Sequence, residues 1–185
     1  MRIVAGAHRG AKIITSESRE LRPTSDRVRE SLFNILDGGR YLNSYRQKLV
    51  IDAFAGTGAL GLEAISRGAS HVIFLEQAVS SLKVLFQNIR LINAQDKTTV
   101  IAGDAAQFGQ PSNERAGLVM LDPPYQSQMG ISCIKALKYS GWIGPETLIV
   151  LEHSSREKIC IPEWIKILDN RKYGLSHLTF MQEMA

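Results

Sequence analysis

The sequence predicts an α/β fold built on a mostly parallel β-sheet that helices cover on both faces. Short apolar runs rich in β-branched residues alternate along the chain with segments of helical periodicity. Strands that are apolar throughout are typical of parallel sheets, because both faces of such a sheet are buried. A chain of 185 residues suits one domain of ordinary size with a substantial core.

The expected elements follow one another in the order strand, helix, strand. Strands are expected at residues 48–54, 71–76, 98–104, 116–122 and 147–152. Helices are expected at residues 59–68, 78–93 and 130–141. The segment 164–184 holds two apolar runs with no helix-length segment between them, which predicts a β-hairpin. One strand in that hairpin should therefore run antiparallel to the others.

The N-terminal part of the chain has a different pattern. Residues 1–15 predict short strands around a glycine-containing turn, and residues 21–36 predict a helix. The apolar residues that share one face of this helix are Val28, Leu32, Ile35 and Leu36. That face should pack on the body of the protein. Arg27 and Arg29 lie off it and should stay available to a partner.

The positive charge of the chain is concentrated near its N-terminus. Residues 1–48 hold ten Lys or Arg and five Asp or Glu, a net charge of +5, whereas the remaining residues hold twelve and thirteen, a net charge of −1. A basic arm on a near-neutral body favours a polyanionic partner such as nucleic acid, although a solvated surface has the same composition. The residues expected to contact that partner are Arg9, Lys12, Arg22, Arg27 and Arg29.

The composition argues against several other classes of protein. The chain has no apolar run near the roughly 18 residues of a membrane span, and its start lacks the apolar stretch of a signal peptide. Its two cysteines, Cys133 and Cys160, have no CxxC spacing, which favours a reducing compartment, the cytoplasm, over a disulfide framework or a zinc site. The four histidines also lack metal-ligand spacing. We therefore expect neither a membrane association nor a metal.

A glycine-rich loop follows the strand expected at 48–54. In the stretch DAFAGTGALG, Gly56, Gly58 and Gly61 fit the pattern G-x-G-x-x-G, which lets the backbone turn tightly and approach a ligand closely. Glu76 ends the next strand about 20 residues later, where an acidic residue can hold ribose hydroxyls. This spacing fits a dinucleotide or another adenosine cofactor. A glycine-rich turn without a ligand is the alternative structural interpretation.

Acidic residues at the ends of strands favour S-adenosylmethionine over a dinucleotide. Asp52 would repel a pyrophosphate, but its carboxylate could meet the ammonium group of a methionine moiety. Asp104, which ends the third strand, could accept a hydrogen bond from an adenine amino group. The residues expected to hold the cofactor are Asp52, Phe54, Gly56, Gly58, Glu76 and Asp104.

The motif DPPY ends the fourth expected strand. Each proline restricts its own φ and the residue before it, and neither donates to a sheet ladder, so a rigid turn begins at Asp122. Asp122 and the carbonyl of Pro123 could accept hydrogen bonds from an amino group on a planar base, and Tyr125 could stack on that base. Positioning and electrostatics would then support methyl transfer without a metal. A chance turn in a loop is the alternative.

Taken together, these motifs resemble the RsmD family of S-adenosylmethionine-dependent methyltransferases. The similarity also rests on RIVAGAHRGAKI at 2–13, LRPTSDRVRESLFNIL at 21–36 and RKYG at 171–174, so it spans nearly the whole chain. This family methylates the exocyclic N2 amine of one guanine in bacterial small-subunit (16S) ribosomal RNA. The resemblance implies a Rossmann-like fold with a seven-stranded sheet whose last strand is antiparallel. It also implies an RNA substrate within an assembling small ribosomal subunit.

One position departs from the family pattern. The family often carries a second acid two residues after the acid that ends the second strand. Here the text is LEQAVS, so Ala78 stands at that place, and Glu76 must hold the ribose without that helper.

The expected organisation is a single methyltransferase domain, with a basic RNA-binding extension at 1–47 and a catalytic core at 48–185. Other functions share some of the motifs. A DNA amino-methyltransferase usually needs a separate target-recognition region, for which no stretch is long enough. A protein glutamine methyltransferase commonly has Asn in place of Asp122, and a dehydrogenase does not explain the DPPY turn. A non-catalytic RNA-binding module does not explain an intact cofactor loop.

Overall fold

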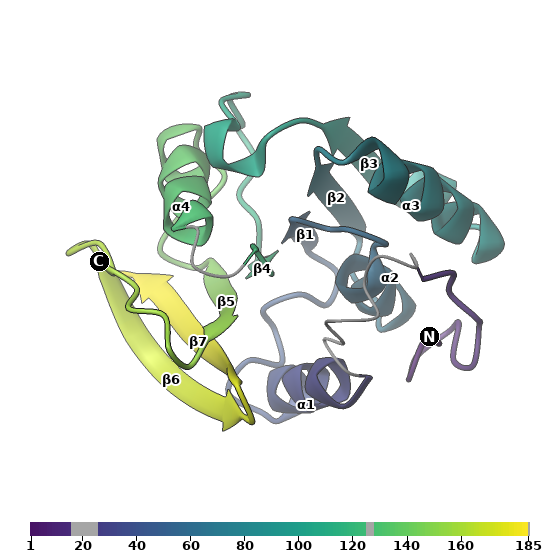
Figure 1. The fold of residues 1–185 in the computed structure, drawn as a ribbon, viewed down its shortest axis with the longest axis horizontal. Coiled ribbons are helices and arrows are strands. Elements are labelled where there is room, and N and C mark those ends of the chain that lie inside the picture. The colour runs from purple at the N-terminus through teal and green to yellow at the C-terminus, as the bar shows by residue number, and fades with distance from the viewer. Residues whose placement is uncertain (16–25, 125–127, 185) are drawn as a thin grey trace.

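A seven-stranded sheet forms the centre of the molecule, with the strand order β3-β2-β1-β4-β5-β7-β6 (Figure 1). The structure is a computed structural model that describes residues 1–15, 26–124 and 128–184. The strands are β1 Leu49–Ala53, β2 His71–Glu76, β3 Thr98–Ala102, β4 Leu118–Leu121, β5 Leu148–Ser154, β6 Ile165–Tyr173 and β7 Ser176–Glu183. Neighbours among β1 to β5 pair in parallel, and β7 is antiparallel to both β5 and β6. The predicted mostly parallel sheet with an antiparallel last strand is confirmed.

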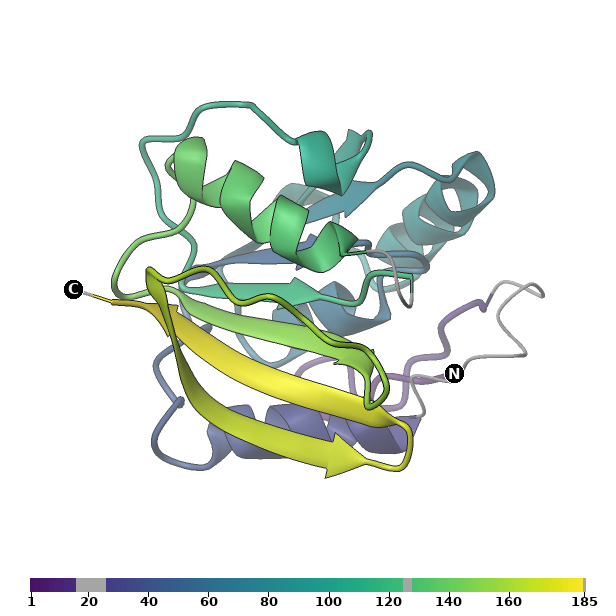
Figure 2. The same ribbon diagram turned by 60° about the vertical axis from the view of Figure 1, so that its left-hand side comes forward.

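Helices cover both faces of this sheet. They are α1 Asp26–Asp37, α2 Ala59–Ser66, α3 Val79–Leu91 and α4 Met129–Tyr139, with short 3-10 helices at Gln95–Lys97 and Ala105–Gln107. Figure 2 shows α1 and α4 on opposite sides of the sheet. Alternate residues of β1 explain this arrangement: Val50 packs with the buried residues of α1, α2 and α3, whereas Ile51 packs with those of α4. Strands β1, β2, β4 and β5 read as continuous apolar runs because nearly all of their side chains are buried on both faces.

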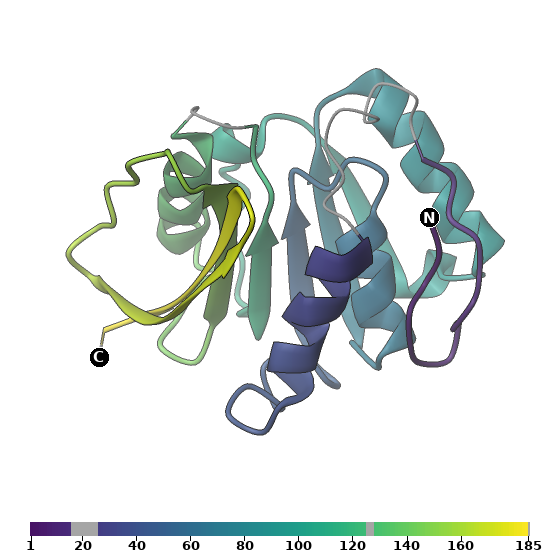
Figure 3. The ribbon, with the colours of Figure 1, turned by 60° about the horizontal axis from the view of Figure 1, so that its bottom comes forward.

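Because helices cover both faces of the sheet, a ligand can reach the sheet only at its edges. The loops that follow the strands therefore define the expected ligand site. In an open parallel sheet this place is the carboxyl edge, where the strands end and the chain turns into the helices. Figure 3 shows that α1 begins near this edge and runs towards the opposite one. Val28 and Leu32 of α1 line a small hollow with Leu121 and Glu152. The first turns of α1 therefore lie against the ends of β4 and β5.

Residues 1–15, which we call the N-terminal arm, fold back on themselves and dock on α2 and α3 (Figure 3). An isolated antiparallel bridge joins Arg2 to Lys12, so the predicted hairpin is present, but its pairing is shorter than a strand. Gly6 has φ of 85° and lies so close to α2 that a Cβ there would stand 1.9 Å from the carbonyl oxygen of Ser66. Only glycine avoids both the backbone strain and that collision. Ile3 and Ile13 of the arm share the buried core of α1 and α2.

A buried histidine lies where the parallel part of the sheet meets β7. His153 of β5 is opposite His177 of β7, and their ring centroids are 5.4 Å apart. The ring atoms Nε2 and Nδ1 of His153 lie 2.9 Å from Thr179 Oγ1 and 3.0 Å from the Ser154 carbonyl oxygen. Burial lowers the pKa of His153, so the neutral ring is the favoured form in the folded protein.

The β6–β7 hairpin places β6 at one edge of the sheet. Its register shifts between Ile167 and Asp169, which marks an irregularity in the pairing with β7. Arg171 of the same strand forms an ion pair with Asp169 at 2.8 Å.

Among the described residues, no helix is long and apolar enough to cross a membrane.

Candidate active site

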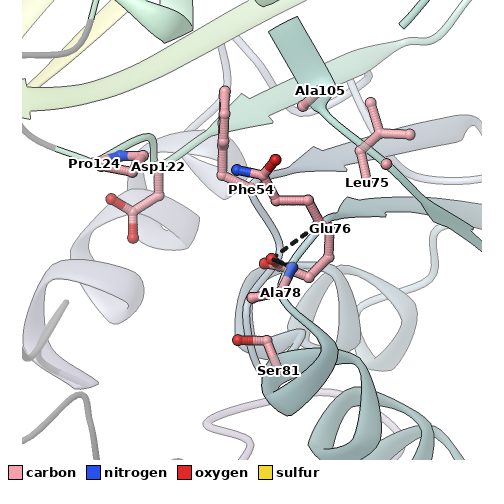
Figure 4. A pocket seen from close by; sticks show the side chains of 10 residues that line it. Phe54, Leu75, Glu76, Ala78, Ser81, Ala105, Asp122 and Pro124 are labelled. Atoms are coloured by element: carbon pink, nitrogen blue, oxygen red, sulfur yellow. Dashed lines mark hydrogen bonds between the residues drawn. The ribbon is translucent and has the colours of Figure 1, made fainter. Parts of the chain in front are cut away.

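Four strand ends at the carboxyl edge enclose a pocket of about 310 Å³ (Figure 4). This volume is at the lower end of the range of small-molecule sites. The residues that line it are Phe54, Leu75, Glu76, Gln77, Ala78, Ser81, Gly103, Ala105, Asp122 and Pro124. They come from the ends of β1, β2, β3 and β4 and from the start of α3. The pocket therefore combines apolar walls with two carboxylates that lie on different strands.

Backbone N–H groups hold the carboxylate of Glu76 in place. Its Oε2 accepts a hydrogen bond from Gly56 N at 2.6 Å, and its Oε1 accepts from Gln77 N at 2.9 Å and Ala78 N at 2.7 Å. A carboxylate has about four lone-pair positions, so these bonds leave room for one further donor on Oε2. Ala78, which lacks the acidic side chain that the family often has there, still supports Glu76 through its backbone.

The glycine loop packs closely on its neighbours. Gly56 and Gly58 have φ of 56° and 81°, in the left-handed region that glycine adopts without strain. A Cβ on Gly58 would lie 2.4 Å from Leu85 Cδ1, and one on Gly61 would lie 2.3 Å from Phe74 Cε1. The glycines predicted from the G-x-G-x-x-G pattern thus allow the start of α2 to approach β2 and α3.

Phe54 lines the pocket and has an unusual backbone conformation. Its φ is 62°, which is uncommon for a residue with a large side chain and is often found at functional sites. In Figure 4 its ring lies between Asp122 and Glu76. Phe54 thus lines the pocket, and its contact with a cofactor stays a prediction.

The other two acids predicted for the cofactor lie differently from Glu76. The Asp52 side chain is 1% exposed, and its Oδ2 accepts from Gly61 N at 2.8 Å, so it supports the first turn of α2 instead of lining the pocket. Asp104 accepts from Ala106 N at 2.9 Å and from Gln107 Nε2 at 2.8 Å. It lines a neighbouring hollow of about 340 Å³ that shares Leu75 with the pocket. The side chain of Asp52 is thus not among those that line the pocket, and its contact with a ligand stays a prediction.

The start of the turn after β4 is held by contacts to β1 and α4. Asp122 N donates to Ala53 O at 3.4 Å, which extends the pairing between β4 and β1 to the pocket. The ring of Pro123 is buried against α4, where a Cβ on Gly130 would lie 3.2 Å from Pro123 Cγ. Asp122 and Pro124 then line the pocket. Tyr125, the third residue predicted for this part of the site, lies outside the described residues.

The predicted RNA-contacting residues fall into three groups. Arg9, Lys12 and Arg27 are exposed, and Arg22 lies outside the described residues. Arg29 is 1% exposed, so the expectation that it stays available is wrong.

Contacts inside the protein explain the burial of Arg29. Its Nη2 donates to the carbonyl oxygen of Arg2 at 2.6 Å, and its Nε lies 3.7 Å from Glu63 Oε2. The helical spacing offers a signal for this position. Phe33 and Leu36, four and seven residues further on, are both fully buried, so Arg29 belongs to the same face.

The family described as Conserved hypothetical protein 95 matches residues 1–182. The chain belongs to this family. The resemblance to the RsmD family that its motifs predict is thereby confirmed. A Haemophilus influenzae relative named Ribosomal RNA small subunit methyltransferase D is 34% identical over 178 residues, which cover 95% of this chain and 90% of the relative. An Escherichia coli relative of the same name is 36% identical over 155 residues, which cover 82% and 74%.

The solved structures support the same fold. A protein described as putative methyltransferase yhhF from Escherichia coli has a TM-score of 0.81 and 31% identity to this chain. The match covers 99% of this chain and 97% of that one. The Rossmann-like methyltransferase fold predicted from the motifs of the RsmD family is therefore confirmed.

This RsmD family member also contains a buried polar cluster that the motifs do not predict. Glu63 of α2 is fully buried and accepts from Val4 N at 2.8 Å, Ala5 N at 3.0 Å and Arg67 Nε at 2.7 Å. Arg67 continues to Asp37 at 2.8 Å. A signal for this cluster was the single acid within the apolar helix ALGLEAIS. The cluster fixes the N-terminal arm to the helix that follows the glycine loop.

The chemistry at Asp37 shows how tightly the cluster is held. Burial would raise the pKa of Asp37, but hydrogen bonds from Tyr45, Arg46 and Arg67 outweigh it and lower that pKa. Burial, with the adjacent Asp37 carboxylate, raises the pKa of Tyr45 to about 12.

Within the described part of the chain, no three His, Cys, Asp or Glu side chains gather as ligands for a metal ion.

Proposed function

We propose that this chain transfers a methyl group from S-adenosylmethionine to the exocyclic N2 amine of one guanine in bacterial 16S ribosomal RNA. One observation carries the proposal: Glu76, at the end of β2, and Asp122, at the end of β4, line the same pocket beside the glycine loop. One carboxylate suits the ribose of the cofactor, and the other suits the amine that accepts the methyl group. The names of the Haemophilus influenzae and Escherichia coli relatives support the choice of substrate.

The residues of the pocket fit S-adenosylmethionine. The lone pair left on Glu76 Oε2 can accept from a ribose hydroxyl, and Phe54 and Leu75 supply apolar walls. Gly56 and Gly58 allow the backbone to approach the ligand, and the hollow beside Asp104 can take the adenine ring. S-adenosylmethionine supplies an electrophilic methyl group on a sulfonium centre.

The protein's own contribution to the reaction is to position a weak nucleophile. The lone pair of a guanine amino group is delocalised into the ring, so the amine needs orientation before it can attack. The Asp122 carboxylate and the main-chain carbonyl of Pro123 accept hydrogen bonds from its two N–H groups. These bonds favour the tetrahedral nitrogen that forms as the methyl group arrives. Asp122 can also receive the proton that the nitrogen releases after methylation.

Apart from the target guanine, the substrate RNA is held outside the pocket. Arg9, Lys12 and Arg27 are exposed, and Arg27 lies on the half of α1 that faces the carboxyl edge. Arg22 and Tyr125 are assigned to the same interface on their sequence positions, with Tyr125 stacking on the target base. In this assignment residues 1–47 form the RNA-binding extension and residues 48–185 the catalytic core, and the substrate is RNA in an assembling small subunit in the cytoplasm.

The test is methyl transfer from tritium-labelled S-adenosylmethionine to unmodified small-subunit RNA, both free and assembled with ribosomal proteins. Nucleoside analysis of the product should give N2-methylguanosine at a single site, and the assembled particle should be the better substrate. Label in an adenine or cytosine nucleoside, or transfer to double-stranded DNA at an equal rate, would contradict the proposal. A calorimetric titration should show binding of S-adenosylmethionine and none of NAD.

A further inference from the structure

One buried side chain connects the N-terminal arm to the glycine loop. Asn88 of α3 is 1% exposed. Its Oδ1 accepts from Ile14 N at 2.8 Å, and its Nδ2 donates to the carbonyl oxygens of Ile14 at 3.0 Å and Thr57 at 2.9 Å. Both N–H donors of the amide and one acceptor position are therefore used. These bonds join residues that are 74 and 31 positions apart in the sequence.

The Thr57 end of this connection lies within the cofactor loop. Thr57 stands between Gly56 and Gly58 and is 2% exposed. Leu85, three residues before Asn88 on α3, supports the same loop, since a Cβ on Gly58 would lie 2.4 Å from its Cδ1. The buried face of α3 therefore sets the position of the glycine loop through one apolar contact and one hydrogen bond.

The Ile14 end lies within the segment that carries exposed basic residues. Lys12 and Arg9 precede Ile14 in the arm, and both are exposed. Ile13, which lies between Lys12 and Ile14 in the sequence, is 4% exposed and belongs to the core. If the arm moves away from α3, Asn88 loses two of its three hydrogen bonds. An amide left unpaired at a buried position is costly, so the position of the arm and that of Asn88 depend on each other.

We propose that Asn88 is a positioning residue that couples RNA binding at the arm to cofactor binding at the glycine loop. The inference rests on the proposed function, because it takes RNA as the ligand of the arm and S-adenosylmethionine as the ligand of the loop. Each ligand orders one partner of Asn88, so the second ligand has less ordering to do and binds more tightly. Thermodynamic linkage requires the same factor in both directions.

The first test needs no RNA and no activity. Amide hydrogen exchange of the full chain is followed by NMR, with S-adenosylhomocysteine as the probe for the cofactor site. The Ile14 N–H should exchange more slowly when the probe is bound, although Ile14 is not among the residues that line the described pocket. In Asn88→Ala the same addition should leave the exchange at position 14 unchanged. Unchanged exchange at Ile14 in the wild-type protein would overturn the proposal.

The second test measures RNA affinity with and without S-adenosylhomocysteine. The wild-type protein should bind a small-subunit RNA fragment about fivefold or more tightly with the probe, the usual lower scale of such coupling. In Asn88→Ala the ratio should fall to about one. Asn88→Asp keeps the acceptor for Ile14 N but loses both donors, so it should also lose the coupling and serves if the alanine variant does not fold.

A neighbour on the same helix provides the matched control. Ile89 is 3% exposed, so Ile89→Val removes a buried methyl group from α3 but no hydrogen bond. This variant should lose some thermal stability and keep the ratio of RNA affinities. A full ratio in Asn88→Ala, or a ratio of one in the wild-type protein, would contradict the coupling. If the wild-type protein methylates RNA but shows no coupling, the inference alone fails; if no methyl transfer to RNA occurs, the proposed function fails.

Discussion

The two carboxylates of the pocket have different surroundings, which predicts different roles. Glu76 accepts three backbone hydrogen bonds and connects the end of β2 to the glycine loop. Asp122 follows β4, between a backbone pairing with Ala53 and the buried ring of Pro123. A change at Glu76 should therefore act on cofactor binding, whereas a change at Asp122 should act on the methyl-transfer step.

Glu76→Ala should weaken the binding of S-adenosylmethionine by roughly 1–3 kcal/mol, the scale for hydrogen bonds to a charged acceptor. This corresponds to a rise of roughly 5-fold to 150-fold in the dissociation constant, measured by calorimetry. Glu146→Ala is the matched control, because Glu146 is exposed and precedes β5 at the opposite edge of the sheet. Equal affinity in the Glu76 variant and the wild-type protein would exclude Glu76 from the site.

Asp122→Ala should leave the affinity for S-adenosylmethionine nearly unchanged and slow methyl transfer at least ~100-fold, as for the loss of one positioned polar group. Single-turnover transfer to RNA measures this rate separately from binding. Asp122→Asn keeps one acceptor oxygen and should recover part of the rate. A near wild-type rate in Asp122→Ala would remove Asp122 from the reaction.

At the scale of elements, α1 shows how a charged residue is misplaced when one apolar residue, Phe33, is left out of the predicted buried face. The buried face of α1 includes Phe33 and Leu36 as well as Val28 and Leu32, so it is centred nearer to Arg29 than the sequence indicates. A charged side chain is normally assigned to the surface, and only a distant partner can reverse that assignment. Here the partners are the Arg2 carbonyl oxygen and the Glu63 carboxylate, in other segments of the chain.

The two arginines near the start of α1 should therefore behave differently. Arg27→Ala removes an exposed charge, so RNA affinity should fall and the log–log dependence on salt should flatten by roughly 0.7 to 0.9. Arg29→Ala should keep the salt dependence but lower the free energy of unfolding by about 1–3 kcal/mol, because Glu63 loses one partner and retains Arg67. Salt-dependent RNA binding and urea unfolding distinguish the two. A flatter salt dependence in Arg29→Ala would contradict its structural role.

The contact between β5 and β7 gives the stability a defined dependence on pH. Burial lowers the pKa of His153, and the nearby His177 lowers it further, whereas an unfolded histidine titrates near about 6.5. Below that pH the unfolded chain binds a proton that the folded protein does not, so stability falls as the pH drops through this range. Above this pH the histidine is neutral in both the folded and the unfolded protein, so it no longer lowers the stability.

Urea unfolding at pH 7.5 and pH 5.5 checks this expectation. These two values lie roughly one pH unit above and below the pKa of an unfolded histidine. The free energy of unfolding should fall between the two values in the wild-type protein. In His153→Gln the fall should be smaller, because that variant has no ring to protonate at this position. Other titrating groups contribute to both proteins, so an equal fall in both would exclude His153 as a source of the pH dependence.

For the whole molecule, the sequence predicts the sheet well and the interior polar contacts poorly. The strand expected at 71–76 is β2 without any shift, and the hairpin expected at 164–184 is β6 and β7, because apolar runs and turns are local signals. Glu76 and Asp122 meet in one pocket because parallel strands end at one edge. By contrast, Glu63 and Asn88 have partners in the arm that no local pattern identifies.

The irregular β6 has a consequence for association between molecules. A strand at the end of a sheet presents unpaired backbone groups to solvent, and these can pair with a second chain and start aggregation. On β6 the exposed side chains include Lys166, Arg171 and Lys172, and the register shift near Asp169 interrupts the regular repeat of the backbone. Charge and irregularity together make this edge a poor template for an added strand. The hairpin that completes the fold thereby also disfavours polymerisation through this edge of the sheet.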